Sequence, residues 1–115
     1  MKFYKNLYVS DGYKKKKEEL IGRMKNGKYP LSAFILVLIE DGSNQMEFYP
    51  AAMLYQGYLE TDNLYIVGMA ESYMDMLYMV EDITREVYEK TGTADIRAYI
   101  KAQETQETER ENEEV

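Results

Sequence analysis

The chain has 115 residues, of which 45% are hydrophobic and 30% charged, and a formal net charge of −7, values typical of one globular domain. It contains no cysteine and no histidine, which excludes disulfides, thiolate zinc sites, cysteine nucleophiles and imidazole acid–base chemistry. No apolar segment reaches the roughly 20 residues that span a membrane, and the first residues lack the apolar region of a signal peptide. We therefore expect a cytoplasmic protein with no cofactor and no membrane partner.

Charge is unevenly distributed along the chain. Residues 1–30 carry nine Lys and Arg against three Asp and Glu, whereas residues 31–103 carry four against twelve and residues 104–115 carry one against six. The densest basic run is a candidate patch for an anionic partner and consists of Lys14, Lys15, Lys16 and Lys17. Three interpretations stay open: a solvated helix face, an acidic protein or the chain's own acidic tail, and a nucleic acid. The sequence pI of about 4.7 argues against the nucleic acid.

The first part of the chain predicts a strand, a helix and a central strand. Residues 3–9 alternate in polarity, and Lys5 dilutes the pattern, which indicates a strand near an edge. Residues 13–26 carry an apolar stripe at helical spacing. Residues 31–40 contain an unbroken apolar run at 33–39, whereas a strand with one face in water would alternate. We therefore expect this strand to be covered on both faces.

The middle of the chain predicts two more strands and a short helix. Residues 45–49 have the pattern of a short strand. Pro50 cannot continue a central ladder but suits the first position of a helix, so residues 50–59 are predicted as a short helix, with a continued strand as the alternative. A second apolar run at residues 64–69 predicts a second central strand.

The clearest helix signal begins at Ser72. Asp75 follows it three residues later, which is a capping signature, and Gly92 is a typical helix stop. The predicted core stripe of this helix consists of Tyr73, Met76, Leu77, Val80, Ile83 and Val87. A last short helix is predicted at residues 93–102. Residues 103–115 are almost entirely polar, which predicts a disordered acidic tail.

These elements follow in the order β-α-β-β-α-β-α-α and predict one α+β domain over residues 1–102, with a single four-stranded sheet. We expect the two long helices, at residues 13–26 and 72–91, to cover one face. Each large apolar side chain left in water on the other face would cost about 1.5–3 kcal/mol, against a typical total stability of ~5–15 kcal/mol. The cover of that face is expected to be the 50–59 helix, the last helix or another copy of the chain.

Three side chains off the core stripe of the helix at 72–91 form a candidate interface: Met74, Tyr78 and Met79. The chain has twelve Tyr and eight Met, and both residue types are enriched at interfaces. The alternative is that these Tyr and Met side chains fill gaps in the core. The first interpretation predicts a homodimer.

A polar turn follows the first central strand and is a candidate site for a small ligand. Its residues are Asp41, Asn44, Gln45 and Glu47. A carboxylate pair here is a candidate for acid–base chemistry, but Asp-Gly and Ser-Asn are also ordinary turn formers. A calcium loop starting at Asp41 fails, because Met46 and Ala52 stand where the loop needs glycine and glutamate. The sequence has no phosphate-binding motif.

Several segments resemble those of a group of short bacterial proteins with no assigned function. They are Asp-Gly-Ser-Asn-Gln at 41–45, Asp-Asn-Leu-Tyr-Ile-Val-Gly-Met-Ala at 62–70, Glu-Val-Tyr-Glu-Lys-Thr-Gly at 86–92 and Asp-Ile-Arg at 95–97. The resemblance spans about residues 1–101, implies a cytosolic bacterial protein and carries over no catalytic residue. We expect a non-enzymatic interaction or accessory protein that self-associates. Weak nucleic-acid binding and ligand binding are the alternatives.

Overall fold

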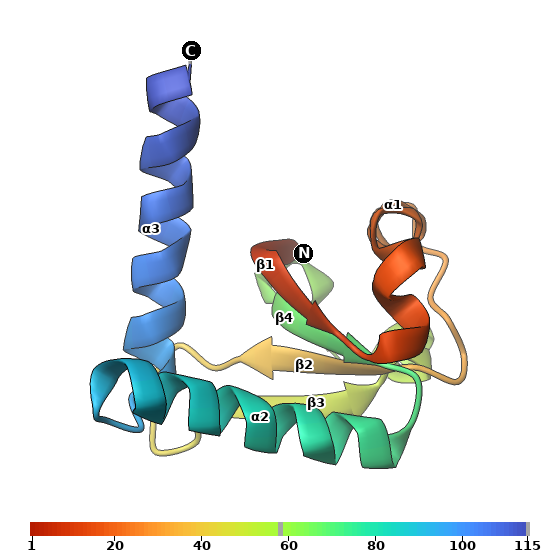
Figure 1. The fold of residues 1–115 in the computed structure, drawn as a ribbon. Helices are drawn as coiled ribbons and strands as arrows, with labels where there is room; N and C mark the ends of the chain where they lie inside the picture. Colours follow the sequence, from red (N-terminus) through yellow and green to blue (C-terminus); the bar gives the residue numbers. More distant parts are fainter. Residues whose placement is uncertain (58, 115) are drawn as a thin grey trace.

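Four strands form one mixed sheet at the centre of the structure, a computed structural model that describes residues 1–57 and 59–114 (Figure 1). The spatial order is β1 (Lys2–Val9), β4 (Tyr65–Ala70), β2 (Phe34–Leu38) and β3 (Met46–Pro50). β1 runs parallel to β4, and β2 runs antiparallel to both of its neighbours. The two apolar runs therefore form the two central strands, as their patterns predict, and β1 lies at an edge.

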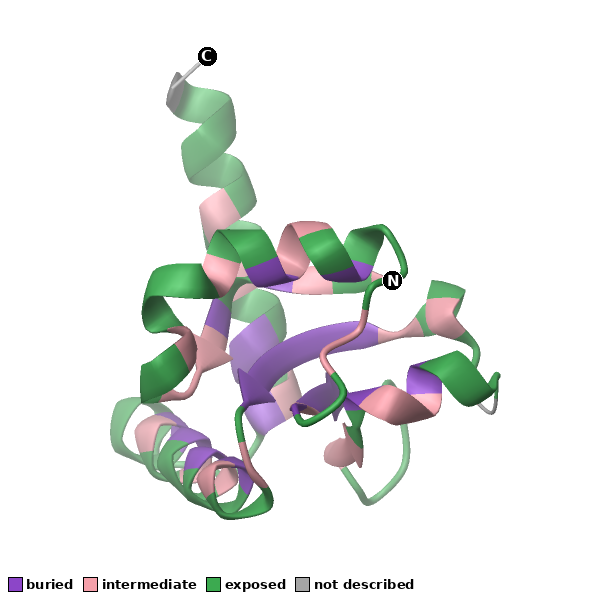
Figure 2. Cartoon of the chain, turned by 90° about the vertical axis from the view of Figure 1, so that its right-hand side faces the viewer, coloured by how far each residue is buried: buried purple, intermediate pink, exposed green. Residues whose placement is uncertain are grey.

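Both faces of the sheet are buried, because β2 is apolar on both sides. Leu36 and Leu38 belong to one core cluster, whereas Ile35 and Val37 belong to the other, and all four side chains are almost fully inaccessible. Figure 2 shows the buried residues along the central strands and on the inner sides of the helices. The α+β class, the four-stranded sheet and the element order are confirmed.

Helices cover the two faces in a different arrangement from the expected one. α1 (Lys17–Lys25) packs on one face through Leu20 and Met24, whereas α2 (Tyr73–Thr91) packs on the other. The prediction that these two helices share a face is wrong; the two long helices on one face are α2 and the start of α3 (Ile96–Glu114). Because both faces are equally apolar, the sequence pattern does not indicate which face each helix takes.

The second face is covered from within the chain. A 3₁₀-helix, η1 (Asp11–Lys16), leads into α1, and another, η2 (Ala51–Gln56), adds Ala51 and Leu54 to the same core cluster. The predicted helix at 50–59 is thus present as the shorter η2, which ends at Gly57 with φ of 73°; residue 58 lies outside the described part. A second copy of the chain is therefore not needed to bury this face.

α3 is much longer than its sequence indicates. Only Ile96, Tyr99 and Ile100 enter the core, yet the helix continues to Glu114 and projects from the body (Figure 1). The predicted disorder of residues 103–115 is therefore wrong as far as Glu114. Glu, Gln and Arg have good helix propensity, but this segment has no apolar stripe to reveal a helix by its period. No helix among the described residues is both long and apolar enough to cross a membrane.

Candidate interaction surface

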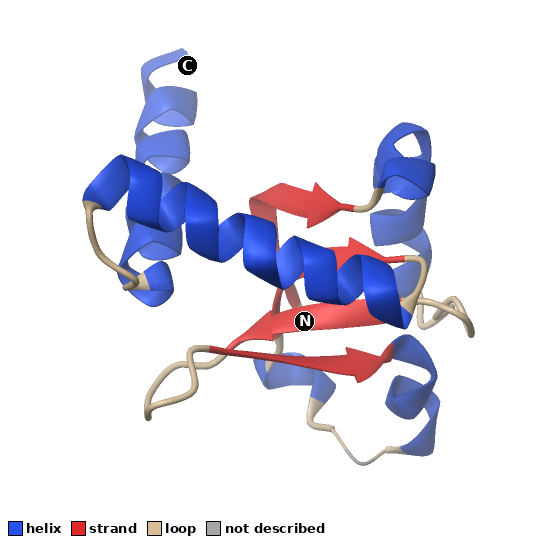
Figure 3. Ribbon diagram, turned by 60° about the horizontal axis from the view of Figure 1, so that its bottom comes forward, coloured by secondary structure: helices blue, strands red, loops and turns tan. Residues whose placement is uncertain are grey.

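The strand β3 has one edge bound to β2 and one edge open. The Ile39 N–H donates to the Gln45 oxygen and the Ala51 N–H to the Ala33 oxygen, each at 2.8 Å. Because hydrogen-bonded pairs alternate along an antiparallel ladder, the main-chain N–H and C=O groups of Met46 and Phe48 point away from β2. Within the described residues, β2 is the only strand that pairs with β3 (Figure 3).

The opposite edge of the sheet, at β1, is occupied by side chains of α3. The Lys5 N–H donates to the Glu104 carboxylate at 3.5 Å, and the Lys5 ammonium pairs with the Glu111 carboxylate. Charged side chains and a covering helix are the usual protection of an edge strand against pairing with another chain. The two edges therefore differ: β1 is protected by α3, and β3 has no comparable cover among the described residues.

One flank of α2 overhangs β3 and is apolar. The Tyr73 ring lies 6.0 Å from the Phe34 ring and 5.7 Å from the Phe48 ring, centroid to centroid. Leu77, one helical turn on, shares the Tyr73 flank. Tyr73 is 52% exposed and Leu77 37% exposed. We define the β3 surface as Phe34, Met46, Phe48, Tyr73 and Leu77, of which the strand residues are half-buried against the α2-side core.

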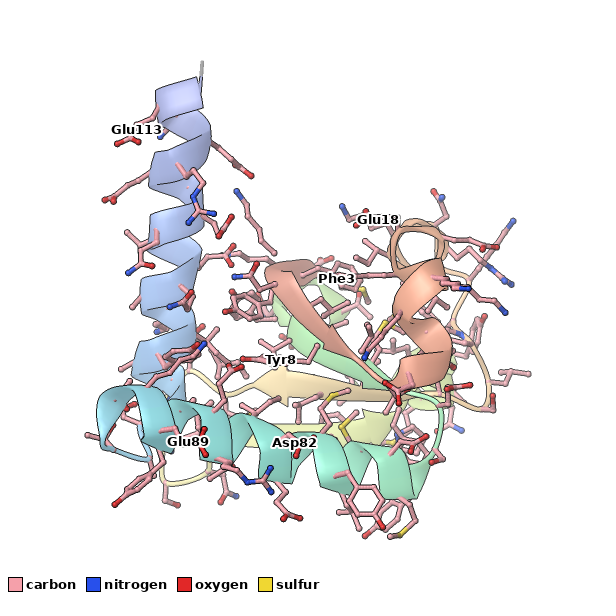
Figure 4. All side chains as sticks on the ribbon, viewed as in Figure 1. Phe3, Tyr8, Glu18, Asp82, Glu89 and Glu113 are labelled. Atoms are coloured by element: carbon pink, nitrogen blue, oxygen red, sulfur yellow. The ribbon has the colours of Figure 1, made fainter. Side chains whose placement is uncertain are left out.

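Three acidic side chains of α2, those of Asp75, Asp82 and Glu86, lie on its other flank. Asp75 and Asp82 line a groove with Tyr8 and Val9 of β1, and Figure 4 shows Asp82 and Tyr8. The Tyr8 hydroxyl donates to the Glu86 carboxylate; burial, and then this hydrogen bond, raise the pKa of Tyr8. The flank toward β1 is therefore acidic, whereas Tyr73 and Leu77 on the flank toward β3 are uncharged.

The face of β3 turned away from α2 carries a polar pair. The Tyr49 hydroxyl donates to the Glu47 carboxylate two residues away. That hydrogen bond, aided by partial burial, raises the pKa of Tyr49 to about 12. Glu47 is the one charged residue of β3, and its carboxylate is bound by this hydroxyl.

Of the three residues of the predicted interface, only Met74 and Tyr78 are accessible. Met79 is 7% exposed and belongs to the core, because it shares the stripe of Met76 and Ile83; its assignment to an interface is wrong. Met74 and Tyr78 are 52% and 58% exposed, but Tyr78 lines the acidic groove with Asp75. Tyr73 and Leu77, predicted as core residues from their spacing, instead lie on the partly exposed flank that adjoins the open edge.

The four lysines of the candidate basic patch lie on η1 and the first residue of α1. Lys14, Lys15 and Lys16 are exposed and Lys17 is half-exposed. Lys14 pairs with Asp11 at 2.9 Å, and this hydrogen bond and charge lower the pKa of Asp11. A groove between α1 and α3 has Lys17 and Lys25 on one side and Glu107 and Glu111 on the other. Glu107 and Glu111 of α3 thus lie across a groove from Lys17 and Lys25 of α1.

The candidate polar turn is fastened to the start of α3 by Arg97. Its guanidinium donates to the Ile39 oxygen at 2.6 Å and to the Gly42 and Asn44 oxygens at 3.3 Å each.

Gln45 completes this clamp: its amide donates to the Ala94 oxygen at 2.9 Å and accepts from the Arg97 N–H at 3.0 Å. Asn44 and Gln45 line a groove of about 280 Å³ beside Phe48, whereas Asp41 and Glu47 are not among its lining residues. The groove therefore contains neither of the two carboxylates, and Arg97 carries a structural role that was not predicted from the sequence.

A cavity of about 590 Å³ lies between α3 and the first residues of β1 and β4. Some of its polar groups are engaged with one another: Lys101 pairs with Glu40 at 2.9 Å, and the Tyr65 hydroxyl donates to Glu104 at 3.0 Å. Burial and that hydrogen bond raise the pKa of Tyr65. Among the residues that the structure describes, no three Asp, Glu, His or Cys side chains are grouped as a metal site would require.

Comparisons with protein-family models, curated proteins and solved structures find no match. The resemblance to short bacterial proteins therefore stays a prediction from sequence.

Proposed function

We propose that this protein is a non-enzymatic interaction or accessory protein that self-associates as a homodimer through the β3 surface. The observation that carries the proposal is the combination, at one margin of the fold, of an open strand edge with a half-exposed apolar helix flank. An open edge offers a row of main-chain donors and acceptors to another strand. Apolar side chains beside it add area that leaves water on association.

The charge distribution supports the β3 surface as the place where two copies would meet. Two chains with a net charge of −7 each repel one another, so they associate best through a surface with few acidic groups. The β3 surface contains no charged side chain, whereas the β1-facing flank of α2 carries Asp75, Asp82 and Glu86. A bacterial cytoplasmic location is part of the proposal: it rests on the resemblance to short bacterial proteins, and a chain without cysteine is compatible with a reducing compartment.

Light scattering at tens of micromolar tests the proposal. The expected mass is about twice the 13.5 kDa of the chain. Leu77→Glu, which places a charge on the half-exposed flank, should give the monomer mass. Met74→Glu is the matched control, since Met74 lies on the same helix with 52% exposure but outside the β3 surface, and it should leave the dimer intact. A wild-type monomer at these concentrations would overturn the proposal.

A further inference from the structure

We infer that two copies pair their β3 strands antiparallel across a two-fold axis at Phe48, which joins the two four-stranded sheets into one. This inference rests on the proposed self-association and adds the register of the contact. An isologous dimer of this kind uses the same edge twice, so its donors and acceptors must complement themselves under a two-fold rotation.

The main-chain groups on the open edge satisfy this condition. Gln45 and Ala51 bond to the β2 side, and the direction of the main-chain groups alternates along the strand. The outward-facing residues are therefore Met46, Phe48 and Pro50. With Phe48 opposite the partner subunit's Phe48, each N–H of the pair donates to the other's oxygen. The Met46 N–H then donates to the partner subunit's Pro50 oxygen. Proline has no N–H, so this register leaves no outward donor of the three residues unpaired.

Side-chain chemistry selects the same register. The Phe48 axis places Glu47 opposite the partner subunit's Tyr49, so a carboxylate faces a phenol hydroxyl on both sides of the axis. Shifting the axis to Glu47 would set two carboxylates directly opposite each other, which is destabilising. Within each copy, the Tyr49 hydroxyl already donates to Glu47. The Tyr49 hydroxyl can therefore donate either to Glu47 of its own chain or to Glu47 of the partner subunit.

The apolar side chains also meet at this axis. Phe48 lies on the α2 face of the strand, next to the Tyr73 ring. Joining the strands brings two copies of Phe48 together, flanked on each side by Tyr73 and Leu77. The β1 edge does not offer this arrangement, because Glu104 and Glu111 of α3 occupy it.

Cysteine cross-linking tests the register, and the natural chain has no thiol to interfere. Opposed residues of a hydrogen-bonded antiparallel pair have Cα atoms about 5.5 Å apart, within the ~4.4–6.8 Å of disulfides. Phe48→Cys should therefore form a disulfide-linked dimer on mild oxidation. Met74→Cys, exposed on α2, is the control for random collision and should cross-link far less.

A second pair of variants keeps Phe48 in place, in case its loss weakens the dimer. Glu47→Cys mixed with Tyr49→Cys should give the mixed disulfide, and each variant alone should cross-link several-fold less. Peptide mass spectrometry identifies the linked residues. Strong self-linking of Glu47→Cys alone, or none of these disulfides in a chain that light scattering shows to be a dimer, would overturn the register and leave the proposed self-association standing. A monomeric wild type would overturn both.

Discussion

The Tyr73 ring of α2 lies 5.7 Å from the Phe48 ring of β3, centroid to centroid, with 60° between the ring planes. The contact joins the last strand of the sheet to the helix above it, yet Tyr73 remains 52% exposed. An aromatic pair that is still half in water at a sheet margin has area left to bury against another molecule.

Tyr73→Ser should weaken the proposed dimer. Aromatic pairs contribute ~0.5–1.5 kcal/mol beyond their buried area, so we expect the dissociation constant to rise about tenfold or more in sedimentation equilibrium. Tyr88→Ser is the control, since Tyr88 is exposed on the same helix but lies outside the β3 surface. Equal effects of the two substitutions would argue against a specific role for the Tyr73 flank.

The central sheet was predictable because the runs at Ile35 and Ile66 are apolar on both faces, and only covered strands tolerate that pattern. The face that each helix covers was not predictable, because the two faces of the sheet are equally apolar and neither attracts a given helix more. Tyr73 and Leu77 fit the apolar stripe of α2 by spacing, but the sheet ends at β3, so these side chains overhang its margin. The exposure of these two side chains depends on the order of the strands in the sheet, and that order cannot be inferred from a single sequence.

The site residues show the same limit. Asp41 and Glu47 are close in sequence, but Asp41 lies in the loop between β2 and β3, whereas Glu47 lies within β3 and bonds to Tyr49. Arg97 is far along the chain and reaches the turn only because α3 starts beside it. A polar turn is visible in sequence through its turn formers, whereas the distant side chain that fastens it is not.

Arg97→Ala should destabilise the hairpin that carries β3. The guanidinium holds three main-chain oxygens, of Ile39, Gly42 and Asn44. Losing a charged donor to the half-buried Ile39 oxygen costs about 1–3 kcal/mol, so chemical denaturation should show a fall in the free energy of unfolding of this size. Arg85→Ala, which removes only exposed ion pairs on α2, should cost less than about 1 kcal/mol.

Gly68→Ala should destabilise the core, whereas Gly22→Ala should not. A Cβ on Gly68 would lie 2.7 Å from the Met79 sulfur and 3.3 Å from the Leu36 Cβ, and overpacking a core costs about 1–3 kcal/mol. A Cβ on Gly22, inside α1, meets nothing within 4 Å, and alanine in a helix interior is more favourable by ~0.5–1 kcal/mol. Thermal unfolding of both variants should therefore shift in opposite directions.

The free energy of unfolding should fall above pH 10. Burial raises the pKa of Tyr4 to about 12 from 10.0. Burial and hydrogen bonds to Glu86 and Glu104 raise the pKa of Tyr8 and Tyr65 in the same direction. Between about pH 10 and 12 the unfolded chain loses these protons while the folded chain keeps them, so stability present below pH 10 is lost as pH rises. Urea titrations across this range should show the fall, and Tyr8→Phe should make it shallower. A flat profile to pH 12 would contradict these shifts.

Removing residues 103–115 should leave the domain folded but open its second edge. The described contacts of this segment with the sheet are the Glu104 hydrogen bonds to Lys5 and Tyr65 and the Lys5–Glu111 ion pair. Exposed or partly buried contacts of this kind contribute about 1 kcal/mol each, so the truncated chain should unfold cooperatively with a smaller helical circular dichroism signal. The Lys5 N–H would then be free for another strand, and the chain would have unprotected edges at both β1 and β3.

Light scattering should then detect species larger than a dimer, increasing with concentration, because a sheet with two open edges can extend at both ends. Glu111→Gln is the control: it removes the ion pair but keeps the helix over β1, and it should stay dimeric. A truncated chain that remains strictly dimeric would contradict the proposed role of α3 in protecting the β1 edge. Combining the truncation with Leu77→Glu separates the edges, since any association that persists must then use β1.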